Sequence, residues 1–174
     1  MKKLIFKILI LVNIAHINGA GLTLSHERGT IYIEEQKGWE LSKDIFGMPF
    51  MYFSPKHSGQ RSNISFAHTG TDFTFDKKEM KKNESQYREG KEKWAKKVGA
   101  SILKVSPYLT FKNNFGHLVH KIGVQYKFKK KHYFETSYYI ECKKKMLFSK
   151  TLRLQQAGSH QKSFDKIIKS VNCE

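Results

Sequence analysis

The chain has 174 residues and a formal net charge of +17, from 32 lysines and arginines against 15 aspartates and glutamates. No internal repeat and no proline- or serine-rich linker interrupts it, which excludes a repeat array or several linked domains. Arginine occurs only as Arg28, Arg61, Arg88 and Arg153, so lysine supplies the other positive charges. Lysine is a hydrated point charge that lacks the planar fork with which arginine grips phosphate, and this disfavours nucleic acid as a partner.

The N-terminus, MKKLIFKILILVNIAHINGA, has the three parts of a secretory signal peptide. Lysines form a positive head, and residues 4–12 are apolar apart from Lys7. The small residues Gly19 and Ala20 end the segment. We therefore predict a signal peptide over residues 1–20, cleaved after Ala20, and a single mature domain over residues 21–174.

The apolar part of this leader is far shorter than the roughly 20 residues that a membrane-spanning helix needs. No later apolar run is long enough to span a bilayer either. The mature protein is therefore expected to have no integral membrane segment and to reside in the periplasm or outside the cell.

N-terminal sequencing of the exported protein should begin at Gly21 or within a few residues of it, because the leader is removed during export. Exported material that still carried Met1 would contradict the assignment of a cleaved signal peptide.

The first half of the mature chain is predicted to contain short strands. Residues 30–34 alternate between apolar and polar side chains, as a half-buried strand does. The stretch WELSKDIFGMPFMYFSP, residues 39–55, is predicted as a structured loop that leads into a strand at about residues 49–53. Residues 63–68 form another predicted strand.

A long, highly charged helix is expected from about residue 77 to residue 98. Asp76 and Glu79 have the spacing of a capping box at its start, and Gly99 is placed to end it. The apolar stripe of this helix is narrow and consists of Met80, Tyr87, Trp94, Ala95 and Val98. Such a stripe predicts a helix that lies on a sheet with most of its circumference in water.

The second half is predicted to form antiparallel strands over residues 102–111, 117–128, 132–142 and 146–154. A final helix over about residues 161–172 places Phe164, Ile167, Ile168 and Val171 on one face. That apolar face must pack against the sheet. The predicted fold class is therefore α+β, with an antiparallel sheet that carries a long mid-chain helix and a C-terminal helix.

Cys142 and Cys173 are the two cysteines of the chain. An exported protein lives in an oxidising compartment, where two cysteines are more often joined than free. Cys142 ends a core strand and Cys173 follows the final helix, so a Cys142–Cys173 disulfide would hold that helix to the sheet. Two unpaired buried thiols remain the alternative.

Two lysine triplets lie at predicted hairpin turns, at opposite ends of the strand that they share. They are the candidate anion-binding residues, Lys129, Lys130 and Lys131 at one turn and Lys143, Lys144 and Lys145 at the other. Removing the three lysines of the leader lowers the formal charge from +17 to +14, which favours an anionic envelope component or an acidic protein as a partner. A lysine-rich surface can also reflect an AT-rich genome, and both interpretations stay open.

Some short segments have the residue spacing of catalytic motifs but lie in the wrong structural context for catalysis. Ser101 and Lys104 have Ser-x-x-Lys spacing, but that motif opens a helix and here lies in a strand-like run. Glu135 and Glu141 occupy the non-core face of one predicted strand, about 20 Å apart at the usual strand rise, which is too far for a glycosidase pair. No catalytic residue is predicted.

The histidines have no metal-ligand spacing. His117 and His120 lie three positions apart in a predicted strand, so their side chains point to opposite faces. His57, His68, His132 and His160 are scattered. No metal site and no cofactor are predicted.

Tyr108, Tyr133 and Tyr139 are out of phase with the predicted buried face and lie near basic turns. Basic and aromatic groups together can bind nucleic acid or sugar polymers. We favour the other interpretation, in which these tyrosines pack under the long helix or under a second layer.

The element order and four segments resemble the PsbP-like family. The segments are GWELSKDIFGMPFMYFSP, YREGKEKWAKKVGA, HKIGVQYKFKKKHYFETSYYIEC and FDKIIKSV, within residues 30–173. This family includes the PsbP protein of photosystem II, Ran-binding Mog-type proteins and exported bacterial relatives. The resemblance implies an α/β/α sandwich and a binding or assembly-assisting role, and it assigns no functional residue.

The sequence therefore favours an exported, non-enzymatic binding or accessory protein of the periplasm or cell envelope. One alternative is an envelope-associated hydrolase whose site is assembled from dispersed histidines and glutamates. Another is a secreted basic effector that binds polyanions.

Overall fold

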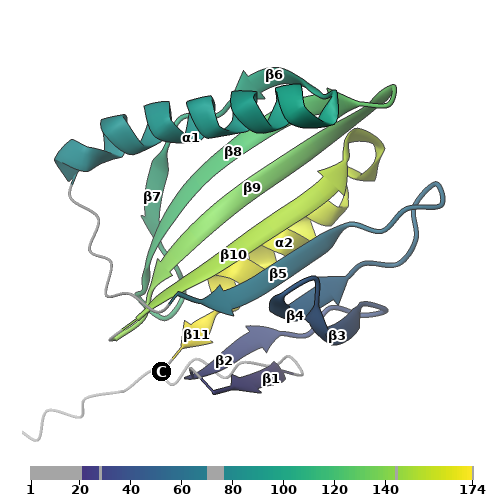
Figure 1. Cartoon of the computed structure of the whole chain (residues 1–174). Helices are drawn as coiled ribbons and strands as arrows, with labels where there is room; N and C mark the ends of the chain where they lie inside the picture. The colour runs from purple at the N-terminus through teal and green to yellow at the C-terminus, as the bar shows by residue number, and fades with distance from the viewer. Residues whose placement is uncertain (1–20, 28, 70–76, 144, 174) are drawn as a thin grey trace, which may run out of the picture.

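The computed structural model describes residues 21–27, 29–69, 77–143 and 145–173 (Figure 1). The predicted signal peptide, Asp76 of the predicted capping box and Lys144 lie outside these residues, and so does the side chain of Met80.

Eight of the described strands form one antiparallel sheet. Their order across it is β3 (Glu40–Ile45), β4 (Met48–Phe53), β5 (Asn63–His68), β10 (Met146–Leu154), β9 (Lys131–Glu141), β8 (Leu118–Phe128) and β6 (Ser101–Val105). β7 (Leu109–Lys112) pairs with β8 beyond the end of β6, so β6 and β7 together form one edge of the sheet.

A second, three-stranded sheet brings together strands from the beginning and the end of the described residues, in the order β1 (Gly21–His26), β2 (Gly29–Glu34) and β11 (Asn172–Cys173). Helix α1 (Lys77–Val98) crosses one face of the large sheet, and α2 (His160–Ser170) lies against the opposite face after a short 3₁₀ turn, Gln155–Ala157 (Figure 1). The predicted α/β/α sandwich is confirmed.

The larger core lies between α2, the small sheet and the central strands. Phe164, Ile167 and Ile168 recur at helical spacing on α2 and are almost completely buried. They pack with Tyr138 and Ile140 of β9, which face α2 because alternate residues of a strand point the same way. Each such large side chain contributes about 1.5–3 kcal/mol when fully buried.

The smaller core lies under α1, on the other face of the same strands. Val124 and Tyr126 of β8 are buried there against Tyr87 and Trp94 of the helix. Tyr133 of β9 packs in the same cluster, which confirms that it lies under the long helix. Val98, by contrast, was placed on the buried stripe, but it is 38 % exposed because the last turn of α1 reaches beyond the core.

The predicted loop over residues 39–55 is wrong in its first half, since residues 40–45 form β3 and pair with β4. Phe46 and Gly47 form the turn between the two strands and have positive φ angles of 53° and 73°, and Asp44, near the end of β3, has a φ angle of 55°. β3 is an edge strand with mostly exposed or half-buried side chains. Its sequence, ELSKDI, therefore lacks the apolar alternation by which strands are recognised.

The predicted strand over residues 102–111 is divided into β6 and β7. Ser106, Pro107 and Tyr108 interrupt it, and proline has no amide hydrogen to donate to a neighbouring strand.

β1 and β11 were not predicted. The bounds of α1 and β10 agree with the prediction, and Gly99, with φ 71°, follows the helix end.

Candidate functional site

The first lysine triplet lies at the tight turn between β8 and β9. Phe128 and Lys131 are the last paired residues of these strands, so Lys129 and Lys130 are the two turn residues. Both have positive φ angles, 46° and 65°, and all three lysines of the triplet are exposed.

Lys143 and Lys145 of the second triplet lie at the turn between β9 and β10, where the amide of Cys142 donates a hydrogen bond to the carbonyl of Lys145 at 3.0 Å. Lys143 and Lys145 are exposed. Because β9 runs between the two turns, the triplets lie at opposite ends of the sheet and form separate patches, as predicted (Figure 1).

Further lysines surround the first triplet. Lys96 and Lys97 occupy the last turn of α1, whose C-terminal end lies at the same end of the molecule as the β8–β9 turn (Figure 1). Lys127 pairs with Ser101 at the start of β6, and Lys104 pairs with Gln125. We call this surface the basic end and define it as Lys96, Lys97, Lys104, Lys127, Lys129, Lys130 and Lys131.

A regularity of the sequence underlies the basic end. Residues 93–134 contain no aspartate or glutamate. Their lysines are Lys93, Lys96, Lys97, Lys104, Lys112, Lys121, Lys127, Lys129, Lys130 and Lys131. The segment folds into the end of α1, the β6–β7 edge and β8, so one side of the molecule carries this charge. The acid-free run is the sequence signal that would have predicted Lys96, Lys97, Lys104 and Lys127.

The aromatic side chains beneath the basic end pack on one another. The rings of Tyr126 and Tyr133 are stacked with centroids 5.3 Å apart, and Trp94 meets Tyr126 edge-on at 5.0 Å. Burial, followed by the charge of Glu135, raises the pKa of Tyr126. These rings are engaged in the core, and they do not form an open platform on which a base could stack.

Glu135 forms an ion pair with Lys91 of α1, under the helix. The Lys91 ammonium also lies 5.4 Å from the ring centroids of both Tyr87 and Trp94. The face of β9 that carries Glu135 was interpreted as non-core, but α1 covers it and Glu135 is 7 % exposed. The pair therefore links the helix to the sheet.

Glu141, on the same face, pairs with a different residue. Its Oε1 lies 2.7 Å from Nε2 of His120, and the other ring nitrogen, Nδ1, lies 3.4 Å from the hydroxyl of Thr110. His120 is 2 % exposed. The two glutamates are thus held in separate pairs and do not form one carboxylate pair.

Histidines that are far apart in the sequence approach one another at two places, His57 with His160 and His26 with His68. Nδ1 of His160 lies 2.8 Å from the hydroxyl oxygen of Ser62, and the rings of His57 and His160 are 6.2 Å apart. Burial lowers the pKa of His160, and the nearby His57 and Arg153 lower it further. Ser62 is 2 % exposed, whereas His57 and His160 are both half-buried.

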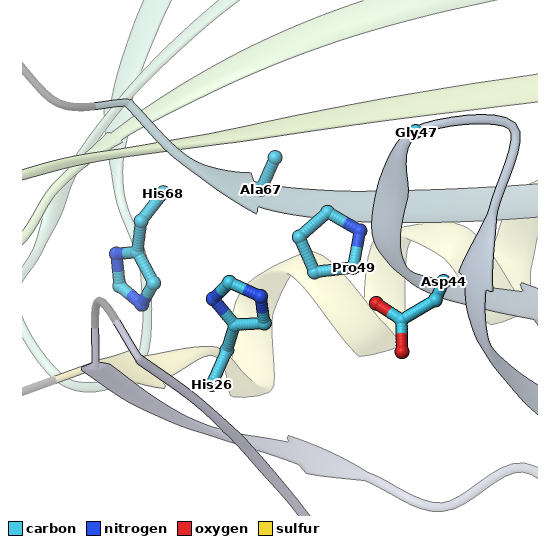
Figure 2. Close-up of a pocket in the computed structure, with 6 residues that line it drawn as sticks. All are labelled: His26, Asp44, Gly47, Pro49, Ala67 and His68. Carbon is cyan, nitrogen blue, oxygen red and sulfur yellow. The ribbon is translucent and has the colours of Figure 1, made fainter.

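His26 and His68 line a cavity of about 330 Å³ between β1, β5 and the β3–β4 turn. Their imidazole rings face one another, and Asp44 lies beside Pro49 on the far side of the cavity (Figure 2). Across the part of the chain that the structure describes, no group of three or more His, Cys, Asp or Glu side chains is arranged to hold a metal ion.

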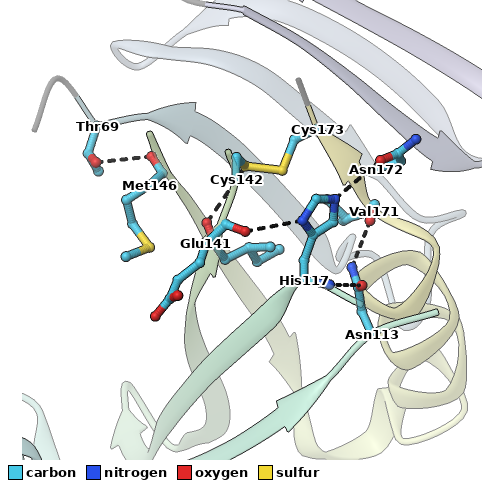
Figure 3. Close-up of a disulfide and its surroundings, with 10 residues drawn as sticks. Thr69, Asn113, His117, Glu141, Cys142, Met146, Val171, Asn172 and Cys173 are labelled. Carbon is cyan, nitrogen blue, oxygen red and sulfur yellow. Dashed lines mark hydrogen bonds between the residues drawn. A yellow bond between two sulfur atoms is a disulfide. The ribbon is translucent and has the colours of Figure 1, made fainter. Parts of the chain in front are cut away.

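Cys142 and Cys173 come to disulfide distance, with their Cα atoms 5.6 Å apart (Figure 3). The same corner contains two other links to the C-terminus. Nε2 of His117 lies 3.2 Å from the side-chain oxygen of Asn172, and Asn113 donates a hydrogen bond to the carbonyl of Val171 at 2.7 Å. This corner lies at the opposite end of β9 from the basic end (Figure 1).

Among the described residues, no helix is both long and apolar enough to cross a membrane.

Neither a protein-family model nor a curated protein matches the sequence. Solved structures are similar in fold. Cyanobacterial PsbP (CyanoP) from Synechocystis sp. PCC 6803 has a TM-score of 0.59 at 8 % identity, over 90 % of this chain and 94 % of its own.

LpqN, involved in cell envelope biogenesis of Mycobacterium tuberculosis, has a TM-score of 0.58 at 12 % identity, over 88 % of this chain and 90 % of its own. Both likenesses extend over most of the described strands and helices. At these identities they concern the fold and no individual residue. The chain therefore has the PsbP-like fold.

Proposed function

We propose that this protein is an exported, non-enzymatic accessory or binding protein of the cell envelope, and that it engages an anionic partner through lysine-rich surface. The observation that supports this proposal most directly is the segment over residues 93–134, which contains no acidic residue. It folds so that seven lysines gather at the basic end. A concentration of one sign of charge on one side of a protein attracts and orients an oppositely charged partner.

The comparisons support the envelope part of this proposal. LpqN, which has the same fold, is a protein involved in cell envelope biogenesis. The leader sequence and the Cys142–Cys173 pair also fit an exported protein, since disulfides persist in oxidising compartments.

Retention on heparin and on anionic vesicles should fall steeply with added salt, because binding to a polyanion releases counterions. Reversing charge at both turns, with Lys129, Lys130, Lys131, Lys143, Lys144 and Lys145 each changed to Glu, should abolish retention at moderate salt. Circular dichroism would check that the variant is folded. Unchanged retention of this variant would mean that the lysine content reflects composition and not binding.

A further inference from the structure

We infer that the basic end docks on the surface of an anionic phospholipid bilayer. The inference rests on the proposed function and specifies both the surface and the partner. It assigns binding to the basic end alone, whereas the charge-reversal experiment above changes both lysine turns together.

The charge of the basic end fits a bilayer because it is carried by lysine and is spread over several elements. Its lysines come from the last turn of α1, from β6, from β8, from the β8–β9 turn and from the start of β9. Lysine acts as a point charge without a preferred geometry, and the headgroups of a bilayer present a diffuse and mobile negative charge. Each lysine near such a surface strengthens binding by about fivefold.

Exposed apolar side chains accompany these lysines. Val98, directly after Lys97, is 38 % exposed, and Leu103, directly before Lys104, is 51 % exposed. The pairing of β6 with β8 shifts register between Ile102 and Lys104. Leu103, on the outer strand β6, therefore has no partner residue on β8. Binding at a membrane surface combines attraction to anionic lipid with shallow burial of apolar groups, and the basic end supplies both.

The backbone of the β8–β9 turn provides an independent observation. Two-residue hairpin turns with both residues at positive φ favour Asn-Gly. Most side chains are disfavoured there because their Cβ atom crowds the backbone. Here both positions are lysine, with φ angles of 46° and 65°. A lysine-rich composition explains the number of lysines but not their placement at two strained positions. The two lysines place charge at the tip although Asn-Gly would stabilise this turn more.

Two other partners fit this surface less well. Pairing of a foreign strand with the β6–β7 edge is opposed by the register shift, by Lys104 and by Pro107, which are devices that protect sheet edges. Single-stranded nucleic acid stacks its bases on exposed aromatic rings, but Trp94, Tyr126 and Tyr133 pack on one another beneath the lysines.

The test uses protein purified after export, so that the leader does not itself insert, and measures co-sedimentation with vesicles. Phosphatidylcholine vesicles are compared with vesicles that also contain phosphatidylglycerol. We expect binding only to the latter. Changing Lys129 and Lys130 to Glu should weaken it by at least about 25-fold, at fivefold for each lysine. The matched control, Lys143→Glu with Lys145→Glu, has the same change in net charge and should weaken binding by less than about fivefold. Equal losses in the two variants would overturn the assignment to the basic end.

A further double variant separates a bilayer from a soluble polyanion. Val98→Ser with Leu103→Ser should reduce binding to the anionic vesicles while retention on heparin stays unchanged. Vesicle binding that is insensitive to this change would overturn the bilayer as the partner.

A third variant guards against a loss that is due to misfolding. Lys129→Asn with Lys130→Gly relieves the turn, so its melting temperature should rise while vesicle binding falls. A rise in melting temperature with full vesicle binding would overturn the role of the tip.

The wild-type protein separates this inference from the proposed function. Retention on heparin without binding to any vesicle would overturn the bilayer and leave the proposed function standing. Retention on neither matrix would overturn both.

Discussion

Replacing Cys142 and Cys173 with serine is expected to lower the melting temperature by roughly 10 °C. The two cysteines are 31 residues apart in the sequence, and closing a loop of that length restricts the unfolded chain by about 3–4 kcal/mol in the chain-entropy description. A domain of this size changes its melting temperature by about 2–4 °C for each kcal/mol. Differential scanning calorimetry of the exported protein measures the change.

The reduced wild-type protein is the matched control, because it should melt at the temperature of the serine variant, while reductant should leave that variant unaffected. Binding to anionic vesicles should survive in both, since the disulfide and the basic end lie at opposite ends of β9 (Figure 1). Mass spectrometry under alkylating conditions checks the bond directly. Two free thiols in exported protein would show that the clamp does not exist.

Elements with regular apolar spacing could be predicted from the sequence. Phe164, Ile167 and Ile168 identify α2 because they recur at helical spacing and bury one face. The helix α1 was found by its length, its narrow stripe and Gly99, although Val98 at its end proved exposed. In each of these cases a pattern within one segment determines the structure.

Elements whose stability comes from a distant partner could not be predicted. β3 has little apolar alternation and exists because β4 supplies its hydrogen bonds. β11 consists of Asn172 and Cys173 alone, and its partner is Tyr32 and Ile31 of β2, at the other end of the chain. Neither sequence contains the information that the partner provides.

The same distinction applies to the candidate site. The lysine triplets are contiguous, and the sequence placed both at hairpin turns correctly. The additions to the first triplet, such as Lys97 and Lys127, depend on the pairing of β6 with β8 and on where α1 ends. The ion pair between Lys91 and Glu135 depends on α1 covering a face that was interpreted as non-core.

Changing Lys91 to Met is expected to destabilise the protein by about 3 kcal/mol, because it leaves the buried carboxylate of Glu135 without its cation. The side chain of Glu135 is 8 % exposed and that of Lys91 is 20 % exposed. Changing Glu135 to Leu should therefore cost less, about 1 kcal/mol, because the ammonium of Lys91 can turn to water along its flexible stem. Urea unfolding measures both free energies.

The double variant, Lys91→Met with Glu135→Leu, should lie within about 1 kcal/mol of the wild type, because an apolar pair of similar volume replaces a buried ion pair with little loss. Lys93→Met is the matched control. Lys93 lies two residues further along the same helix and is exposed, so its loss should change stability by less than about 0.5 kcal/mol. A Lys91→Met variant no less stable than this control would mean that water solvates Glu135 and that the pair does not hold α1 to the sheet. Additive costs in the double variant would mean that the two side chains act independently.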